Sequence, residues 1–211
     1  MNSPFIYTVY LPFDLEKDKL YPVIYAMHGM GSNEKDILSL IEELQTDFIL
    51  IGIRGPISKD QGFAYFDIKS YGNPNIDSFD AVVNNLNEFI DNTPGNYPID
   101  TSRKYLLGFS QGAILSMTLA LIMGNKLNGI IALSGYIPKH VKADYSIKSI
   151  ENLSVFISHG EFDQVFPLNI GKDNFDFFKA RNEKTIFTAY PVGHEVSREI
   201  KNDFVKWLCF Q

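Results

Sequence analysis

The sequence lacks features that are typical of several large classes of protein. Cys209 is the single cysteine, so the chain can form no internal disulfide and carries no CxxC metal pattern. Lysine and arginine form no basic run and the net charge is -6, so nucleic acid is not expected as a partner. The longest nearly apolar stretch, residues 113–123, is far shorter than the ~20 residues that span a bilayer. We therefore expect neither a nucleic-acid-binding nor a membrane-spanning protein.

The N-terminal segment MNSPFIYTVY has no basic region followed by an apolar core, so no secretory signal peptide is predicted. A cytoplasmic location is the resulting expectation. Cys209 is expected to be a small apolar residue of the last helix.

What the sequence does contain is a regular alternation of strand-like and helical patterns. With 211 residues, 45% of them hydrophobic, the chain can bury one sizeable core, and we expect a single domain over residues 1–211. Runs rich in Ile, Val, Leu, Phe and Tyr predict seven strands, at residues 6–11, 22–27, 48–53, 104–108, 129–133, 154–158 and 185–190. Apolar stripes at helical spacing predict five helices, within residues 37–44, 79–90, 113–123, 169–183 and 196–208.

This alternation indicates an α/β fold with a mostly parallel central sheet flanked by helices on both faces. Two of the connections are long. Residues 54–78 have a turn-rich composition with several aromatic side chains, and residues 134–152 join two strands but are too few to form a lid domain. Long ordered loops in a compact domain are often functional, so both connections are candidates for the walls of a site.

The stretch Gly108-Phe109-Ser110-Gln111-Gly112 matches the pattern G-x-S-x-G. It ends a predicted strand and opens the most apolar predicted helix, which is the context that a nucleophile elbow requires. Glycines two residues on either side of the serine let neighbouring backbone come close. The helix N-terminus places a positive dipole near negative charge that develops at the serine. Ser110 is therefore the candidate nucleophile.

A serine nucleophile needs an imidazole to take its proton and a carboxylate to orient that imidazole. In this fold class the acid and the histidine follow the serine in that order. Asp163 lies in a loop after the strand at 154–158, and His194 lies just before the last helix. Both positions fall at the sheet edge where open α/β folds bind ligands. Glu161 is the alternative acid, although it comes early in its loop.

The other three histidines have expected structural roles. His159 directly follows a strand and is expected to brace the loop that carries Asp163. His140 lies in the polar segment PKHVKAD and is expected to be solvated. His28 ends a strand and is expected to orient the turn after it.

The turn His28-Gly29-Met30-Gly31-Ser32-Asn33 is rich in glycine and follows a strand. A dinucleotide-binding turn would need a third glycine where Glu34 stands, and a P-loop pattern is absent. The alternative is an oxyanion hole, which pairs the N–H of the residue after the nucleophile with an N–H from a turn after an early strand. That interpretation pairs the N–H groups of Gln111 and Met30.

Five blocks of the sequence resemble the small phospholipase/carboxylesterase family of α/β-hydrolases, which includes acyl-protein thioesterases. They are HGMGSNEKD, GFSQGA, ALSGY, HGEFDQVFP and GHEVS, and they occur in the family's order within residues 20–208. The resemblance implies an α/β-hydrolase fold without a large lid domain. It also implies a catalytic triad of Ser110, Asp163 and His194, with Met30 and Gln111 as oxyanion donors.

Two further stretches bear on specificity by the same resemblance. The block AYFD at 64–67 is similar to a family block near the acyl pocket, where thioesterases often carry tryptophan in place of Tyr65. The segment FIYTVYLP is more similar to bacterial carboxylesterases than to thioesterases. We expect an open cleft walled by residues 54–78, with Tyr65, Phe66 and Tyr136 as the candidate substrate-binding residues.

The resulting hypothesis is a serine carboxylesterase that acts on small-molecule esters of short to medium chain length and needs no metal or organic cofactor. A lysophospholipase or acyl-protein thioesterase is the close alternative. A catalytically inactive binding protein, or a lyase or isomerase on the same fold, is a more distant one. Exposed apolar residues of the C-terminal segment FVKWLCF could form a homodimer face, and the segment could equally belong to the core.

Overall fold

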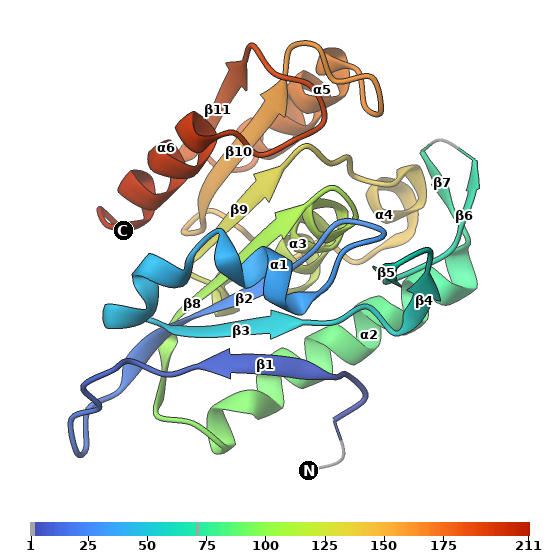
Figure 1. Cartoon of the computed structure of the whole chain (residues 1–211). Coiled ribbons are helices and arrows are strands. Elements are labelled where there is room, and N and C mark those ends of the chain that lie inside the picture. Colours follow the sequence, from blue (N-terminus) through green and yellow to red (C-terminus); the bar gives the residue numbers. More distant parts are fainter. Residues whose placement is uncertain (1–2, 71) are drawn as a thin grey trace.

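A seven-stranded sheet runs through the middle of the molecule (Figure 1), whose computed structural model describes residues 3–70 and 72–211. The strand order is β1-β3-β2-β8-β9-β10-β11. Only the edge pair β1 and β3 is antiparallel, and the other neighbours are parallel. The strands are β1 (Tyr7–Tyr10), β2 (Tyr21–Met27), β3 (Ile49–Ile53), β8 (Ile99–Phe109), β9 (Gly129–Leu133), β10 (Ser154–Gly160) and β11 (Thr185–Tyr190). The mostly parallel sheet predicted from the sequence is thus confirmed.

Helices cover both faces of this sheet (Figure 1). On one face lie α1 (Glu34–Ser39), the 3₁₀ turn η1 (Glu42–Thr46) and α6 (Arg198–Leu208). The other face packs against α2 (Ile76–Asn92), α3 (Gln111–Met123), α4 (Lys139–Asp144) and α5 (Leu168–Lys179). Short 3₁₀ turns, η2 (Thr93–Gly95) and η3 (Gly124–Lys126), follow α2 and α3.

Burial of the sheet on both faces follows from its sequence. All residues of β2, β3 and β9 are buried. In β2 the side chains alternate, so that Tyr25 and Met27 join the core beneath α3 while Ile24 and Ala26 join the core beneath α1 and α6. Helix α3 is apolar on every side and lies at the centre, with only Ile122 partly exposed. A uniformly apolar helix is expected to be the most buried one.

The long connections hold short elements that the sequence patterns did not reveal. Within the connection after β3 lie two small hairpins, formed by β4 (Ile57–Lys59) with β5 (Gly62–Ala64) and β6 (Ile68–Ser70) with β7 (Asn73–Pro74). Neither this connection nor the one after β9, which contains α4, forms a separate lid domain in the described part of the chain.

Three local expectations are wrong. The predicted helix at 37–44 is split, because α1 ends at Ser39 and η1 begins at Glu42. His140 is not solvated: it lies on α4 with its ring edge-on to the rings of Phe79 and Tyr145. Cys209 follows the end of α6 and is exposed instead of packing as an apolar residue of the helix.

The turn between β8 and α3 brings the helix into direct contact with the sheet. Ser110 has a φ of 54°. This conformation is energetically unfavourable for any residue that has a Cβ atom. A Cβ added to Gly108 would lie 2.1 Å from the Gly112 carbonyl oxygen. One added to Gly112 would lie 2.0 Å from the Met27 carbonyl oxygen of β2. Both contacts are with backbone, so only glycine fits, as the G-x-S-x-G pattern predicts.

Gly112→Ala tests this contact. The new methyl group would push α3 away from β2, and overpacking against rigid backbone should lower the free energy of unfolding by about 3 kcal/mol or more. The matched control is Gly95→Ala, because a Cβ at Gly95 meets nothing within 4 Å. Urea titrations should show a large loss for the first variant and little change for the second. Equal stabilities would mean that the contact with Met27 does not constrain the fold.

Candidate active site

Three side chains from separate parts of the chain meet at the carboxyl edge of the sheet. Ser110 follows β8, Asp163 follows β10, and His194 follows β11. The Ser110 Oγ lies 2.9 Å from Nε2 of His194, and Nδ1 of His194 lies 2.8 Å from Oδ2 of Asp163. The carboxylate can only accept at neutral pH, so Nδ1 carries the proton and Nε2 is left to accept from the serine hydroxyl. This tautomer is the one that can deprotonate a serine.

The surroundings of Asp163 fix its carboxylate. Its side chain is fully buried, and Oδ1 accepts hydrogen bonds from the backbone N–H groups of Val165 and Phe166, each at 2.8 Å. Oδ2 is thereby turned toward His194. Glu161, the alternative acid, is exposed, and its side chain has no polar contact within residues 3–70 and 72–211. The structure therefore brings Asp163, and not Glu161, to the histidine.

His159 braces the loop that carries Asp163, as the sequence predicts. Its Nε2 donates to the carbonyl oxygen of Phe166 at 2.6 Å and lies 3.6 Å from the Asp163 carboxylate. Gly171 of α5 packs on the imidazole, so closely that a Cβ there would lie 2.7 Å from the ring. Burial lowers the pKa of His159, which keeps the ring neutral.

Aromatic rings hold the His194 imidazole from two directions. The ring of Phe109 lies 5.0 Å away, centroid to centroid, and the ring of Phe166 lies 5.3 Å away and edge-on. Both come from the turns that carry Ser110 and Asp163. The imidazole is thus confined between the two partners to which it is hydrogen-bonded.

Two backbone N–H groups beside the serine have no acceptor in the described part of the chain. Gln111 is the first residue of α3, so its N–H has no partner within the helix. The N–H of Met30 makes no hydrogen bond to described residues, whereas the next residue, Gly31, donates to the Phe63 carbonyl at 2.8 Å. The turn that carries Met30 lies against Ser110, because a Cβ on Gly29 would be 3.4 Å from the Ser110 Cβ.

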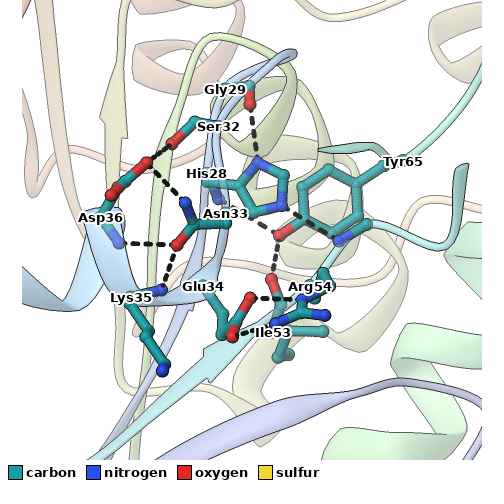
Figure 2. Close-up of polar contacts among 11 residues, drawn as sticks. His28, Gly29, Ser32, Asn33, Glu34, Lys35, Asp36, Ile53, Arg54 and Tyr65 are labelled. Carbon is teal, nitrogen blue, oxygen red and sulfur yellow. Dashed lines mark hydrogen bonds and ion pairs between the residues drawn. The ribbon is translucent and has the colours of Figure 1, made fainter. Parts of the chain in front are cut away.

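Figure 2 shows the hydrogen bonds that hold the turn after β2 in place. Nε2 of His28 accepts from the Gly55 N–H at 3.0 Å, so the proton lies on Nδ1, which donates to the Gly29 carbonyl at 2.6 Å. Burial lowers the pKa of His28. The hydroxyl of Tyr65 accepts from the His28 N–H and donates to the Ile53 carbonyl. His28 thus orients the turn, as predicted.

An ion pair between the buried Glu34 and the partly exposed Arg54 anchors the same turn at the start of α1 (Figure 2). The Glu34 carboxylate accepts from Nε and Nη2 of Arg54 at 2.6 and 2.7 Å. The Arg54 guanidinium holds the pKa of Glu34 below its usual range. The Asn33 side chain caps the helix by accepting from two N–H groups of its first turn. Residue 34, where a dinucleotide fold would carry glycine, is therefore a structural carboxylate.

The prediction that Tyr65 and Phe66 wall a cleft is wrong. Each is only 1% exposed. Tyr65 lies beneath the turn after β2, and Phe66 packs edge-on against Phe79 at 4.9 Å. Aromatic residues in a turn-rich connection suggested an exposed wall, but the two hairpins fold this part of the chain back into the core.

Tyr136, the third predicted substrate-binding residue, is also largely buried. It borders a cavity of about 600 Å³ between α4, α5 and the start of α2. Its ring lies 5.2 Å from that of Phe166, which in turn packs on His194. Tyr136 is therefore linked to the imidazole through the ring of Phe166.

Another cavity, of about 290 Å³, is bordered by His194 itself. It lies between the turn after β2, helix α1 and the chain just before α6. Its apolar lining comprises Ile37, Leu40, Phe109 and Val196, and Asp36 and Glu195 lie at its polar side. Sequence reasoning missed this cavity, because Ile37 and Val196 were assigned to helix stripes that face the core.

No cluster of three or more His, Cys, Asp or Glu side chains in residues 3–70 and 72–211 could hold a metal ion. No helix of the same part of the chain has the length and apolar character needed to cross a bilayer.

The two neutral buried histidines make stability depend on pH. In the folded chain the pKa values of His28 and His159 lie below the ordinary 6.5, so the unfolded chain takes up protons first as the pH falls. Stability is therefore complete above pH 6.5 and decreases below it. Urea titrations should give a lower free energy of unfolding at pH 5.5 than at pH 8, and His28→Gln should shrink the difference. An equal free energy at both pH values would contradict this account of the two histidines.

Comparison with known proteins confirms the family resemblance. A profile of the Phospholipase/Carboxylesterase family matches residues 15–208. Acyl-protein thioesterase 1 homolog 1 of Dictyostelium discoideum is 32% identical over 187 residues, 82% of each chain. Acyl-protein thioesterase 1 of Debaryomyces hansenii is 29% identical over 163 residues, 72% of this chain and 70% of that protein. The Bacillus cereus carboxylesterase structure shares the fold, with a TM-score of 0.86 and 21% identity over 99% of this chain and 95% of the other. The chain therefore belongs to the phospholipase/carboxylesterase family and is a serine hydrolase with an α/β-hydrolase fold.

Proposed function

We propose that the chain is a carboxylesterase that hydrolyses small-molecule esters of short to medium chain length, with Ser110, His194 and Asp163 as its catalytic triad. The observation that carries the proposal is the unbroken hydrogen-bonded series from Ser110 Oγ through both nitrogens of His194 to Asp163. The single catalytic domain would comprise residues 1–211. No step of the reaction calls for a metal or an organic cofactor.

The first half of the reaction is acylation of the serine. As Ser110 Oγ attacks the ester carbonyl carbon, His194 Nε2 takes the hydroxyl proton. The carbonyl oxygen becomes an oxyanion, and the N–H groups of Met30 and Gln111 donate to it. Collapse of the tetrahedral intermediate breaks the bond to the alcohol oxygen, and His194 returns its proton to that leaving group. The products are an acyl-serine and a free alcohol.

Water completes the cycle by the same groups. His194 Nε2 takes a proton from a water molecule as the water oxygen attacks the acyl carbon, and the oxyanion is held again by Met30 and Gln111. Release of Ser110 Oγ, with the proton from His194, yields the carboxylic acid. Asp163 stays ionised throughout and stabilises the imidazolium form of His194. Its two backbone hydrogen bonds hold it in place for that role.

The proposed chain-length preference rests on the space beside the triad. The cavity bordered by His194 measures about 290 Å³. That volume is at the small end of the ~300–1,000 Å³ typical of small-molecule sites. Its apolar lining suits the hydrocarbon part of a short or medium acyl chain.

A second candidate function is that of an acyl-protein thioesterase or lysophospholipase. It is favoured by the relatives from Dictyostelium discoideum and Debaryomyces hansenii, which are named acyl-protein thioesterases. The chemistry at the serine would be the same, with a thiolate or a glycerol oxygen as the leaving group. The two functions differ in this leaving group and in the acyl chain that the enzyme prefers.

Two expectations about the whole protein stay predictions. One is a cytoplasmic location. The other is a homodimer face at the C-terminus, where Phe204 and Leu208 of α6 are buried in the core while Phe210 is exposed.

Hydrolysis of p-nitrophenyl esters from C2 to C16 tests the function, with Ser110→Ala as the matched variant. We expect kcat/KM to be highest between C2 and C6, and kcat of the variant to fall by about 10⁶. A maximum at C8 or longer would favour the thioesterase or lysophospholipase. Activity that survives in Ser110→Ala would refute the assignment of the nucleophile.

A further inference from the structure

Gln111 is buried, with 2% of its surface exposed. Its side chain makes hydrogen bonds of its own, separate from the backbone N–H that is the proposed oxyanion donor. Oε1 accepts from the Tyr65 N–H, and Nε2 donates to the Phe66 carbonyl, both at 2.9 Å. The Tyr65 N–H is a donor and the Phe66 carbonyl is an acceptor, so together they fix the orientation of the Gln111 side-chain amide. The first residue of α3 is thus tied to residues 62–66, here called the coupling segment.

The coupling segment is also tied to the turn that carries Met30. Phe63 forms an antiparallel bridge with Ser32: its carbonyl accepts from the Gly31 N–H and its N–H donates to the Ser32 carbonyl, both at 2.8 Å. The approach is so close that a Cβ on Gly62 would lie 2.2 Å from the Gly31 carbonyl oxygen. One short piece of chain therefore holds the residues next to both proposed oxyanion donors.

The Tyr65 side chain adds a third connection, visible in Figure 2. Its hydroxyl accepts from the His28 N–H at 3.2 Å and donates to the Ile53 carbonyl. Tyr65 thus links the start of the Met30 turn to the same segment that binds the Gln111 amide. The hydrogen bonds of the Gln111 and Tyr65 side chains are all to buried residues, where few water molecules compete with them.

We propose that the Gln111 side chain is a positioning residue which, through the coupling segment, keeps the N–H groups of Met30 and Gln111 aimed at one point. The inference rests on the proposed function. The two donors come from turns after β2 and β8, far apart in the sequence, and no hydrogen bond within residues 3–70 and 72–211 joins the turns directly. An oxyanion hole works only when both donors lie about 2.7–3.1 Å from the oxyanion. A small displacement of one turn would therefore weaken stabilisation of the transition state more than it weakens substrate binding.

Replacement of the amide tests this role. Gln111→Glu keeps the shape and the acceptor for the Tyr65 N–H, but its carboxylate cannot donate to the Phe66 carbonyl. Gln111→Met keeps the length and removes both hydrogen bonds. Gln45→Glu is the matched control, because Nε2 of Gln45 also donates to a backbone carbonyl, that of Leu11 at 2.7 Å, away from the site. None of the three changes alters a backbone N–H.

With p-nitrophenyl acetate, we expect both Gln111 variants to lose about 10-fold to 100-fold in kcat, less than the ~10²–10³ that follows loss of a whole oxyanion donor. KM should change by less than about threefold, and Gln45→Glu should retain kcat within about twofold. Unchanged kcat in the Gln111 variants, with an active wild type, would overturn the inference. An inactive wild type would instead refute the proposed function.

A thionoester substrate separates positioning from general damage to the fold. Sulfur is a weak hydrogen-bond acceptor, so hydrolysis of a thionoester gains little from the oxyanion donors. Each Gln111 variant should therefore lose more activity toward the oxygen ester than toward the matching thionoester. Tyr65→Phe should produce the same asymmetry, and it tests the coupling segment if the Gln111 variants fold poorly. Equal losses on both substrates would mean a purely structural role and would contradict the proposal.

Discussion

The contact between Gly112 of α3 and the carbonyl of Met27 in β2 is the constraint on which the site depends. A Cβ at Gly112 would lie 2.0 Å from that oxygen, so helix and strand touch backbone to backbone. Gln111 is the residue before Gly112 on the helix, and Met30 is three residues after Met27 of the strand. The contact brings the two turns together, and the hydrogen bonds of residues 62–66 then hold them in place. Ser110, between them at the head of the helix, adopts a positive φ.

Around this fixed point the supporting groups are neutral or paired. His28 and His159 are buried, and burial lowers the pKa of each, so neither brings an uncompensated charge to the site. The buried Glu34 carboxylate is matched by Arg54, and Asp163 is satisfied by two backbone N–H groups as well as by His194. Satisfied polar networks of this kind are rigid. Rigid surroundings are what an arrangement of serine, imidazole and oxyanion donors needs in order to act without reorganisation.

Much of this arrangement could be predicted from local sequence. The central strands β2, β3 and β9 are apolar runs buried on both faces, and that property is visible in composition alone. The meeting of Ser110, Asp163 and His194 could be predicted because each follows a strand whose end must lie at one edge of a parallel sheet. Tyr65 and Phe66 are buried by non-local contacts with Gln111, His28 and Phe79. The spacing of apolar residues along the sequence does not reveal such contacts. Their burial was therefore predicted wrongly.

The same non-local contacts change how substrate selection is understood. Residues 54–78 were expected to wall the cleft. Residues 62–66 instead lie beneath the turns that carry Met30 and Gln111, whereas Asn73 and Pro74 of β7 border the larger cavity beside Tyr136. The cavity bordered by His194 itself is smaller and is lined by Ile37 of α1, by Leu40, which follows α1, and by Val196. The preferred ester is therefore expected to depend on the side chains that border these two cavities. They come from α1 and the segment before α6 in one case, and from β7, α4 and α5 in the other.

The central claim is that Ser110 is activated by His194 and is the nucleophile. Labelling with a fluorophosphonate probe, followed by mass spectrometry of the peptides, tests it most directly, since the probe reacts with activated serines. The account predicts one phosphonylated residue, Ser110, and loss of labelling in His194→Ala. A label on another serine, or labelling of Ser110 that persists without the His194 imidazole, would contradict it.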